Sequence, residues 1–483
     1  MTTTAAKPVF TTAQVISQIW QSILPWDSAT ITYGFPAAAL SYFPASSLPA
    51  IGYLTASQQD QIRSAVQLWA DLIPQAMLEA ADGMGQLVFL ADKGGALLHS
   101  TSAAEANLPQ PDEVLGLGGD VTFSTQTLEL NVLARDLQTT ALHEIGHALG
   151  LFHPGPYNGC GFTFADAAAF AQDSAQYSLM SYFFAEETGA QHNDPYGRAW
   201  GAQTPLLYDV AAIQWQYGVD LNTRASDTVY GFHSTAGHAA YDFDAMSRPL
   251  GWEVQDHYLR LGRPPVITIW DGGGIDTLDL SGYATPSRVD LEEGGFSDVA
   301  GLTSNVSIAF GAMVENAVGG AGSDTLKGNR LSNVLTGGGG DDVLDGGDGE
   351  DTAVFAGARE RYRVENDNGA VTVTDLTGAE GTDRLTGIEQ LRFADQTVQL
   401  AARAAQPALS LRSATILEGA TGKHTALIEV ILSRPAERDV TFAYATEHGT
   451  ATAGDYVAIS GTGRIAAGQS STVIAVEVLG DAL

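Results

Sequence analysis

The first 230 residues mix helical and strand-like spacings of apolar positions. Between 57 and 73, apolar side chains recur every three or four residues with polar residues between them. This spacing predicts an amphipathic helix whose apolar stripe packs into a core. The stripe consists of Ile62, Val66, Trp69 and Ile73. The stretch from Val121 to Ser124 alternates apolar and polar residues instead, which predicts a short strand.

A second helix is predicted from Leu133 to Ala148, and it carries two histidines on one face. His143 and His147 lie four residues apart, within reach of a single ion. Gly150 permits a sharp turn at the end of the helix, because glycine tolerates backbone angles that other residues avoid. The returning chain would then deliver His153 as a third ligand.

These histidines predict a catalytic zinc site. Three neutral imidazoles leave one tetrahedral position open, whereas structural zinc sites are closed by four protein ligands. Glu144 follows the first histidine, where a carboxylate could take a proton from a metal-bound water. The alternative is a helix that carries histidines without a metal. It is less favoured, because the glycine and the third histidine stand at the offsets that a metal site requires.

A methionine turn follows the histidine motif. Residues 178–182 read Ser-Leu-Met-Ser-Tyr, and with the motif they resemble the serralysin branch of the metzincin zinc peptidases. The resemblance implies that Met180 lies beneath the metal and that Tyr182 is an additional zinc ligand, which swings away during turnover. It also implies that the strand at 121–124 forms the sheet edge lining the substrate cleft. Further similar stretches lie around Trp69 and at 119–121, 227–231 and 270–324.

Four nine-residue repeats occupy residues 319–354. They start at Gly319, Gly328, Gly337 and Gly346, and they follow the GGxGxDxUx pattern of RTX proteins. Each repeat predicts a glycine-rich turn and a short strand, and two repeats complete one coil of about eighteen residues. Repeat one should therefore stack on repeat three, and repeat two on repeat four. The alternative, a flexible linker, does not explain why Leu326, Leu335 and Leu344 recur in register.

Calcium is the cation predicted between the stacked turns, because carboxylates and backbone carbonyls are hard oxygen ligands. Six acidic residues and no Lys or Arg occur from Leu331 to Ala358, so the carboxylates would repel one another without cations. Ala353, at a position that normally holds a large apolar residue, suggests that the coil ends at repeat four. Each site is expected to lie between facing residues of two stacked repeats. In repeats one and three, the facing residues are Gly320, Gly322 and Asp324 against Gly337, Gly339 and Asp341. In repeats two and four, they are Asn329, Leu331 and Asn333 against Gly346, Asp348 and Glu350. The other predicted ligands in the repeats are Gly338, Gly340, Asp342, Gly347, Gly349 and Asp351.

Ahead of the repeats, the stretch from Asp271 to Asp279 resembles a further serralysin calcium loop. The ligands that the resemblance implies are Asp271, Gly273, Gly274 and Asp276, the carbonyls of Arg224, Ser226 and Thr228, and, at another family position, Met313 and Glu315.

The fold class is predicted as multidomain α+β. A metzincin catalytic domain at 16–230 follows a short propeptide at 1–15, and an RTX β-roll domain covers 231–402. Residues 408–483 alternate apolar and polar positions and resemble a Calx-beta domain, an immunoglobulin-like sandwich. The last strand of a Calx-beta domain has no counterpart in residues 408–483, so the sandwich is expected to be truncated. The stretches that carry the likeness are Leu417 to Gly419 and Tyr444 to Tyr456.

The amino-acid composition narrows the classes of partner that the protein can bind. Among 483 residues, 56 are Asp or Glu and 23 are Lys or Arg, a net charge of −33 that argues against nucleic-acid binding and suits a cation-binding protein. Cys160 is the single cysteine, so no intramolecular disulfide is possible. No apolar run is long enough to span a membrane, and the N-terminus has no Sec-type signal pattern. The resemblance implies a secreted, extracellular protein that leaves through a bacterial ABC-type exporter.

Together these features predict a zinc endopeptidase that hydrolyses protein or peptide substrates. It would use one catalytic zinc, with Glu144 as general base and Tyr182 as hydrogen-bond donor to the oxyanion, and several structural calcium ions. The alternative is a calcium-dependent adhesin built from the repeats and the sandwich. Such a protein would have no use for Glu144.

Overall fold

The chain forms two compact units, Met1–Leu400 and Ala401–Leu483. The computed structural model describes residues 7–21, 24–37, 47–93, 98, 103–110, 118–129, 137–158, 161–194, 197, 199–247, 263–367, 370–400, 409–412, 422–432, 439–447 and 454–480. Several sequence-based predictions lie outside these residues: Cys160, the start of the zinc helix at 133–136, and the stretch at 417–419.

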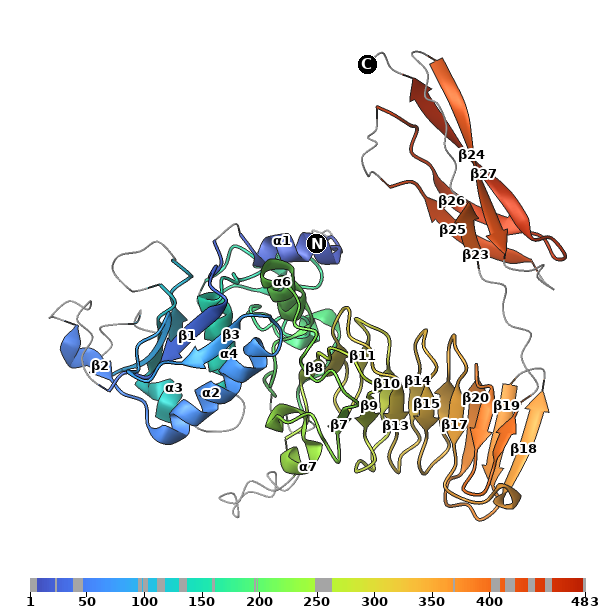
Figure 1. Ribbon diagram of the computed structural model, residues 1–483, viewed down its shortest axis with the longest axis horizontal. Coiled ribbons are helices and arrows are strands. Elements are labelled where there is room, and N and C mark those ends of the chain that lie inside the picture. The colour runs from blue at the N-terminus through green and yellow to red at the C-terminus, as the bar shows by residue number, and fades with distance from the viewer. Residues whose placement is uncertain are drawn as a thin grey trace, which may run out of the picture. The chain divides into compact units, whose positions relative to one another are not determined.

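The N-terminal half of the first unit, blue to cyan in Figure 1, is built on a mixed sheet. The strand order is β3-β1-β4-β6-β5, and β2 pairs with β4. The strands are β1 (Thr30–Gly34), β2 (Ile51–Gly52), β3 (Ala76–Glu79), β4 (Leu87–Asp92), β5 (Ala104–Ala106) and β6 (Val121–Ser124). The strand predicted at 121–124 is confirmed as β6, but its predicted place at the sheet edge is wrong. Strand β5 pairs with it in antiparallel fashion and takes the edge instead.

The predicted amphipathic helix is α2 (Ala56–Ala70), which ends three residues earlier than predicted, so Ile73 lies beyond it. It packs against the histidine helix α4 (Leu137–Ala148). A capping box at Thr55 starts α2, and the whole predicted stripe is buried. The indole Nε1 of Trp69 donates a hydrogen bond of 3.1 Å to the carbonyl of Leu142, which ties the two helices together. The other helices are α1 (Thr12–Ile19), α3 (Thr125–Glu129), α5 (Phe164–Ala167), α6 (Leu207–Tyr217) and α7 (Phe243–Met246), with 3-10 turns η1 (Leu48–Ala50), η2 (Ala185–Thr188), η3 (Ala239–Tyr241) and η5 (Arg359–Arg361).

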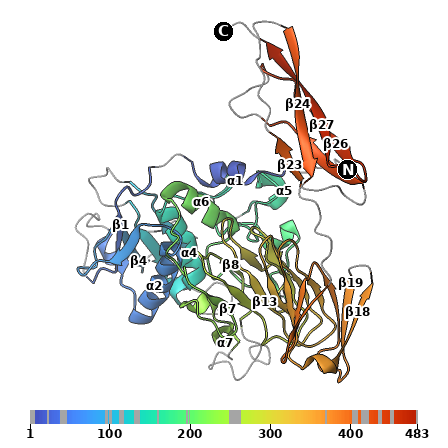
Figure 2. The same cartoon turned by 45° about the vertical axis from the view of Figure 1, so that its right-hand side comes forward.

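The remainder of the first unit is a stack of short strands, most of them parallel (Figure 2). The pairs β11–β12, β18–β19, β19–β20 and β21–β22 are antiparallel. One sheet has the order β22-β21-β17-β15-β13-β9-β7, a second has the order β10-β14-β16-β20-β19-β18, and β11-β12-β8 form a third. The strands are β7 (Val229–Gly231), β8 (Ile267–Ile269), β9 (Thr277–Asp279), β10 (Arg288–Asp290), β11 (Phe296–Ser297), β12 (Val306–Ile308), β13 (Asn316–Val318), β14 (Thr325–Lys327), β15 (Val334–Thr336), β16 (Val343–Asp345), β17 (Thr352–Val354), β18 (Tyr362–Asp367), β19 (Ala370–Asp375), β20 (Thr382–Thr386), β21 (Gln390–Arg392) and β22 (Thr397–Gln399).

The repeats stack as predicted. Repeats one and three supply β14 and β16, in which Leu326 pairs with Leu344. Repeats two and four supply β15 and β17, in which Leu335 pairs with Ala353. All four side chains are fully buried between the two sheets, which confirms an eighteen-residue coil with an apolar interior.

The stack continues beyond repeat four, so the prediction that it ends there is wrong. Strand β20 pairs in parallel with β16 and places Leu385 on Leu344, and β21 pairs with β17 and places Leu391 on Ala353. Both leucines are buried and extend the apolar interior. The glycine pattern is lost at this point because the β18–β19 hairpin is inserted between the two coils.

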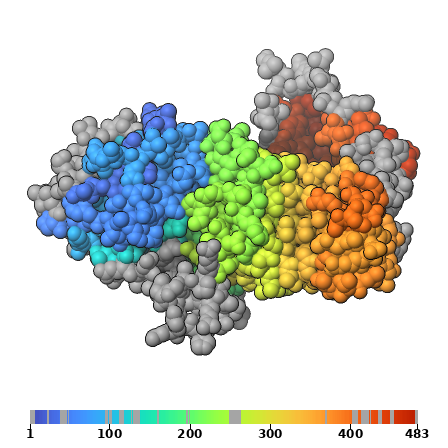
Figure 3. All heavy atoms as spheres, turned by 60° about the horizontal axis from the view of Figure 1, so that its bottom comes forward, coloured from blue at the N-terminus to red at the C-terminus, as the bar shows by residue number. Residues whose placement is uncertain are grey.

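One core runs through the first unit, from Trp69 and Phe89 to Leu326 and Leu391. In the space-filling view, the green residues form a continuous surface with the blue N-terminal part and the yellow strands (Figure 3). A domain boundary at 231 therefore stays a prediction, as does the propeptide at 1–15. Residues 12–15 of that segment belong to α1, where Val15 is fully buried.

The second unit contains β23-β24-β27 in one antiparallel sheet and β25-β26 in another. The strands are β23 (Leu409–Arg412), β24 (Gly422–Leu432), β25 (Val440–Ala445), β26 (Ser460–Ile465) and β27 (Ser471–Gly480). Val430, Leu432 and Ile465 form a small core. The alternating strands are confirmed, and the Calx-beta likeness stays a prediction. Throughout the described parts of the chain, no helix combines the length and the apolar character needed to cross a membrane.

Candidate metal centre

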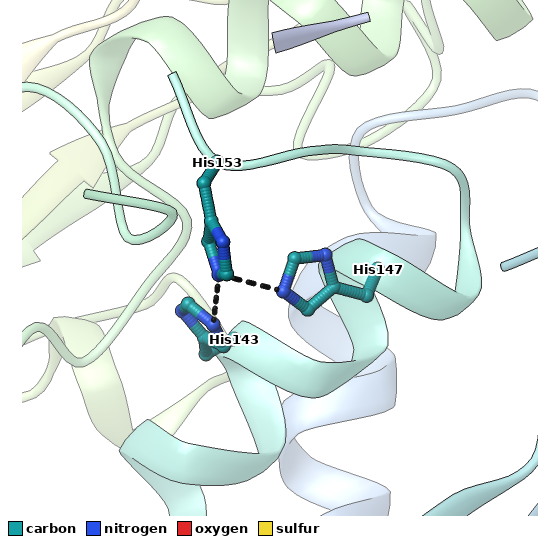
Figure 4. Close-up of side chains that lie close together, drawn as sticks. All are labelled: His143, His147 and His153. Carbon is teal, nitrogen blue, oxygen red and sulfur yellow. Dashed lines mark hydrogen bonds between the residues drawn. The ribbon is translucent and has the colours of Figure 1, made fainter. Parts of the chain in front are cut away.

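Three histidine side chains converge at the end of α4 (Figure 4). His143 and His147 project from the helix, and His153 comes from the chain that follows it. The Nε2 atoms of His147 and His153 are 3.1 Å apart, and those of His153 and His143 are 3.4 Å apart. The sequence prediction that these three residues share one site is therefore consistent with the geometry.

Backbone carbonyls fix the tautomer of each ring. The Nδ1 atoms of His143, His147 and His153 lie 2.7, 2.7 and 3.0 Å from the carbonyl oxygens of Leu179, Leu151 and Tyr157, respectively. Because a carbonyl only accepts, each Nδ1 carries the proton and each Nε2 presents a lone pair. Three lone pairs facing one another repel unless a cation lies between them. Zn–N bonds of about 2.0–2.1 Å in tetrahedral geometry require N–N separations of roughly 3.3 Å, and the separations from His153 to His147 and to His143 are close to this value.

The turn after α4 depends on Gly150. Its φ is +109°, and a Cβ at this position would lie 2.5 Å from the ring of Trp20. The amide of Gly150 donates to the carbonyl of His147, and the amide of Leu151 donates to that of Gly146. A glycine is therefore needed both for the backbone angle and for the space, and it directs the chain back toward the helix.

Burial keeps the imidazoles neutral, as metal ligands must be. It lowers the pKa of His143, lowers that of His147 well below its ordinary value, and lowers that of His153 to about 4. The neighbouring imidazoles lower the pKa of His147 and His153 further. The cluster is thus prepared to bind a cation without first losing protons.

Glu144 lies on the same helix and is only 6% exposed. Burial, assisted by the negative charge of Glu105 on β5, raises the pKa of Glu144 to about 8. A cation at the histidines would oppose this shift, because it favours the ionised carboxylate. A carboxyl group whose pKa lies near neutrality can both accept and return a proton, as a general base must.

Met180 lies beneath α4 and Tyr182 lies beside the histidines. Met180 is fully buried, and a Cβ on Gly146 would come within 2.9 Å of its Sδ atom. The Tyr182 side chain is 40% exposed, its ring centroid is 4.3 Å from that of His153, and its hydroxyl donates to Asn158 Oδ1 at 3.4 Å. The structural role of Met180 and the ligand role of Tyr182 stay predictions.

The glycine turns of the repeats stack closely. The amide of Gly339 donates to the carbonyl of Gly320, and a Cβ on Gly338 would lie 2.1 Å from that oxygen. The predicted facing pairs are one residue out of step, since Gly320 is opposite Gly338 and not opposite Gly337. The same shift applies in the rest of the coil, where Gly322 lies against Gly340, Asp324 against Asp342, Asn329 against Gly347, Leu331 against Gly349 and Asn333 against Asp351. The reason is that two nonapeptides place equivalent positions eighteen residues apart.

A ladder of carboxylates runs along each side of the stack. The amides of Ser287, Asp324 and Asp342 donate to Oδ1 of Asp324, Asp342 and Asp383 in turn. On the other side, four carboxylates each accept a hydrogen bond from a backbone amide. The pairs are Asp276 with the amide of Thr228, Glu315 with that of Asp276, Asp351 with that of Asn333, and Glu389 with that of Asp351. Sequence analysis missed Asp383 and Glu389, because they lie outside the nonapeptide pattern.

Several of these carboxylates keep a buried oxygen free. The Oδ2 atoms of Asp276, Asp342 and Asp351 have no hydrogen-bond partner among the described residues. Burial raises the pKa of Asp342 and Asp351 to about 7 and that of Asp276 and Asp383 to about 8, with smaller contributions from neighbouring acids. Buried, unpartnered carboxylate oxygens in two rows fit divalent cations. Asp341, Asp348 and Glu350 are exposed on the same turns.

The loop predicted at 271–279, ahead of the repeats, also brings several of its predicted ligands close together. The amide of Gly273 donates to Asp271 Oδ1, and Gly274 lies close to the backbone of Ser226. The hydroxyl of Thr228 donates to the carbonyl of Ser226. Of the remaining predicted ligands, Met313 is half-buried, whereas Gly346 is buried and lies against Asp351 Oδ2 and the carbonyl of Gly387.

Comparison with known proteins identifies relatives. Residues 219–410 match the family model described as Peptidase M10 serralysin C terminal. The chain is 36% identical over 337 residues to Metalloprotease AprA of Pseudomonas entomophila, a match that covers 68% of this chain and 65% of that protein. It is 35% identical over 334 residues to Serralysin C of Dickeya chrysanthemi, covering 67% and 65%. A Serralysin of Photorhabdus luminescens is 37% identical over 279 residues, covering 56% and 52%. The chain thus spans just under two thirds of the first two relatives.

Proposed function

Because this chain is related to the serralysins, we propose that it is a secreted zinc metalloendopeptidase that hydrolyses proteins or peptides. The observation that carries the proposal is the convergence of three Nε2 lone pairs beside the buried Glu144. The names of the relatives supply the reaction class. Neither the histidine cluster nor the carboxylate has an evident purpose without a metal and a proton to transfer.

Zinc held by His143, His147 and His153 would lower the pKa of a water molecule and polarise the carbonyl of the scissile bond. The Glu144 carboxylate would take a proton from the attacking water and return it to the nitrogen of the leaving amine. The hydroxyl of Tyr182 would donate a hydrogen bond to the oxyanion. Its exposed ring beside His153 is compatible with movement toward that oxygen.

Strand β5 is the proposed guide for the substrate. It is the outermost strand of its sheet among the described residues, so one row of its backbone groups can pair with an extended peptide. Glu105 in this strand is near enough to raise the pKa of Glu144. A peptide added along β5 would therefore run past the general base.

We further propose that the coil is an RTX β-roll that binds several calcium ions and stabilises the protease. The unpartnered oxygens of Asp276, Asp342 and Asp351 support this, and Asp383 and Glu389 extend the same rows beyond the repeats. Calcium would bind the folded coil more tightly than the unfolded one, so export into a calcium-rich medium would stabilise the fold. Passage through a bacterial ABC-type exporter is part of this proposal. The alternative of an adhesin is not favoured, because the relatives are proteases.

Hydrolysis of an unstructured protein by the purified chain tests the proposal. Excess calcium should be kept present while a chelator selective for zinc is added, so that the coil stays loaded. We expect cleavage to stop with the chelator and to return when zinc is restored. Cleavage that persists after zinc has been removed, as verified by elemental analysis, would overturn the assignment.

A further inference from the structure

We propose that two buried carboxylates, Asp209 and Asp173, position two of the three zinc ligands by clamping the methionine turn from both sides. The inference rests on the proposed zinc centre and deepens it. Neither residue lies in the histidine motif, and neither contacts the imidazoles directly. Each acts through one backbone carbonyl, and each carbonyl accepts the Nδ1 proton of one histidine.

Asp209 clamps the turn before Met180. It lies in the first turn of α6 and is fully buried. Its Oδ1 accepts a hydrogen bond of 2.6 Å from the hydroxyl of Ser178, and its Oδ2 accepts one of 2.7 Å from the amide of Leu179. The amide of Leu206, at the start of the helix, also donates to Oδ2 at 2.9 Å. The carboxylate thus fixes the turn to the N-terminus of α6, where the helix dipole favours a negative charge.

Leu179, whose amide donates a hydrogen bond to Asp209, also orients the His143 ring. The carbonyl of Leu179 accepts from His143 Nδ1 at 2.7 Å. The amide and carbonyl of Leu179 therefore carry two consecutive links, from Asp209 to Leu179 and from Leu179 to the imidazole. A shift of this segment would rotate the ring and move its Nε2 away from the position that faces His153.

Asp173 clamps the turn after Met180. Its Oδ1 accepts hydrogen bonds from the Tyr157 hydroxyl at 2.7 Å and from the Ser181 hydroxyl at 2.8 Å, and the residue is 1% exposed. The carbonyl of Tyr157 accepts from His153 Nδ1 at 3.0 Å. The Tyr157 ring also stacks on that imidazole, with centroids 5.8 Å apart and planes inclined by 16°.

The two serines complete the clamp. Ser178 Oγ accepts from the amide of Met180, and Ser181 Oγ accepts from the amide of Phe183. Each hydroxyl therefore donates to one carboxylate and accepts from the turn. Met180, between the serines, lies under Gly146 of α4. The arrangement joins the helix that carries His143 and His147 to the methionine turn. The turn orients His143 through Leu179 and is linked through Asp173 to Tyr157, which orients His153.

An amide cannot replace the carboxylate of Asp209. Both oxygens of Asp209 face hydrogen-bond donors, so the NH₂ group of an asparagine would meet a hydroxyl or two backbone amides. The shape would be preserved while one side of the clamp is lost. His147 is independent of this device, because its Nδ1 partner is Leu151 in its own turn.

The test uses Asp209→Asn and Asp173→Ala in the full chain with calcium present, and Asp60→Asn, at an exposed position of α2, as the control. We expect zinc dissociation constants about 10- to 100-fold higher in the first two variants, as for other groups that orient a ligating histidine. At saturating zinc, kcat should fall while KM changes little. The d–d absorption of the cobalt-substituted protein should change shape, which a mere loss of stability in still-folded protein would not cause.

If one of these variants does not fold, Tyr157→Phe removes the hydrogen bond to Asp173, and Ser178→Ala removes the bonds to Asp209 and from the amide of Met180. Both should give smaller changes of the same kind. The positioning role would be overturned if the folded variants had the same zinc affinity, the same kcat and the same cobalt spectrum as the wild type. Failure of the wild-type chain to bind zinc or cleave protein would instead refute the proposed function. The two failures are therefore distinguishable.

Discussion

Calcium binding should release protons at mildly acidic pH, and the number can be worked out from the coil. Burial raises the pKa of Asp342 and Asp351 to about 7 and that of Asp276 and Asp383 to about 8. At a pH of about 6.5, three to four of these carboxyl groups are protonated in the calcium-free fold. Because calcium requires the ionised form, its binding should release about three protons per chain at that pH and well under one at a pH of about 9.

The way in which the stability of the calcium-free coil depends on pH follows from the same pKa shifts. These pKa values are raised above the ordinary value for aspartate, so the calcium-free coil is most stable below a pH of about 4. It loses that stabilisation as the pH rises through 7 and 8, because buried carboxylates then ionise without a partner. In calcium the order is reversed, since the ions hold the carboxylates in the ionised form.

Calorimetric titration of calcium in buffers with different ionisation enthalpies measures the proton count directly. Asp342→Asn should lower the count by about one, whereas the exposed Asp60→Asn should leave it unchanged. Binding heats that do not depend on the buffer at a pH of about 6.5 would refute the reasoning. They would mean that these carboxylates are already ionised, or that calcium does not bind them.

Three further predictions concern single side chains. Leu344→Ala should lower the free energy of unfolding by about 2–5 kcal/mol, because the side chain is fully buried between Leu326 and Leu385. The adjacent Val343→Ala, at a site 42% exposed, should change it by about 0.5 kcal/mol or less in chemical denaturation; equal losses would contradict the coil interior. Tyr182→Phe should lower kcat on the order of 10²-fold with little change in KM, and an unchanged kcat would leave the hydroxyl without a role. His153→Ala should lose zinc, and full zinc content by elemental analysis would exclude it as a ligand.

Local spacing explains which parts were predictable from the sequence. His143, His147 and His153 lie within eleven residues, and helix periodicity with one glycine turn is enough to bring them together. The repeats stack because two similar nonapeptides complete one coil, which places equivalent residues of successive coils eighteen apart. In both cases the information lies in a short stretch of chain, as the hydrogen bonds and strand register show.

Long-range pairing explains what the sequence did not reveal. Strand β5 takes the sheet edge because of a pairing with β6 that its short sequence does not specify. Asp209 reaches the methionine turn from about thirty residues away, and an acid near a helix start usually indicates only a cap. The coil continues through Leu385 and Leu391 because apolar stacking persists after the glycine pattern has ended.

The central claim is that Glu144 transfers a proton at a zinc centre formed by the three histidines. Glu144→Gln tests it most directly, with Glu365→Gln on the exposed surface of β18 as control. Zinc content and hydrolysis of an unstructured protein should be measured on the same samples. The account predicts that Glu144→Gln keeps its zinc and loses nearly all cleavage, while the control keeps both. Cleavage near the wild-type rate in zinc-loaded Glu144→Gln would contradict it.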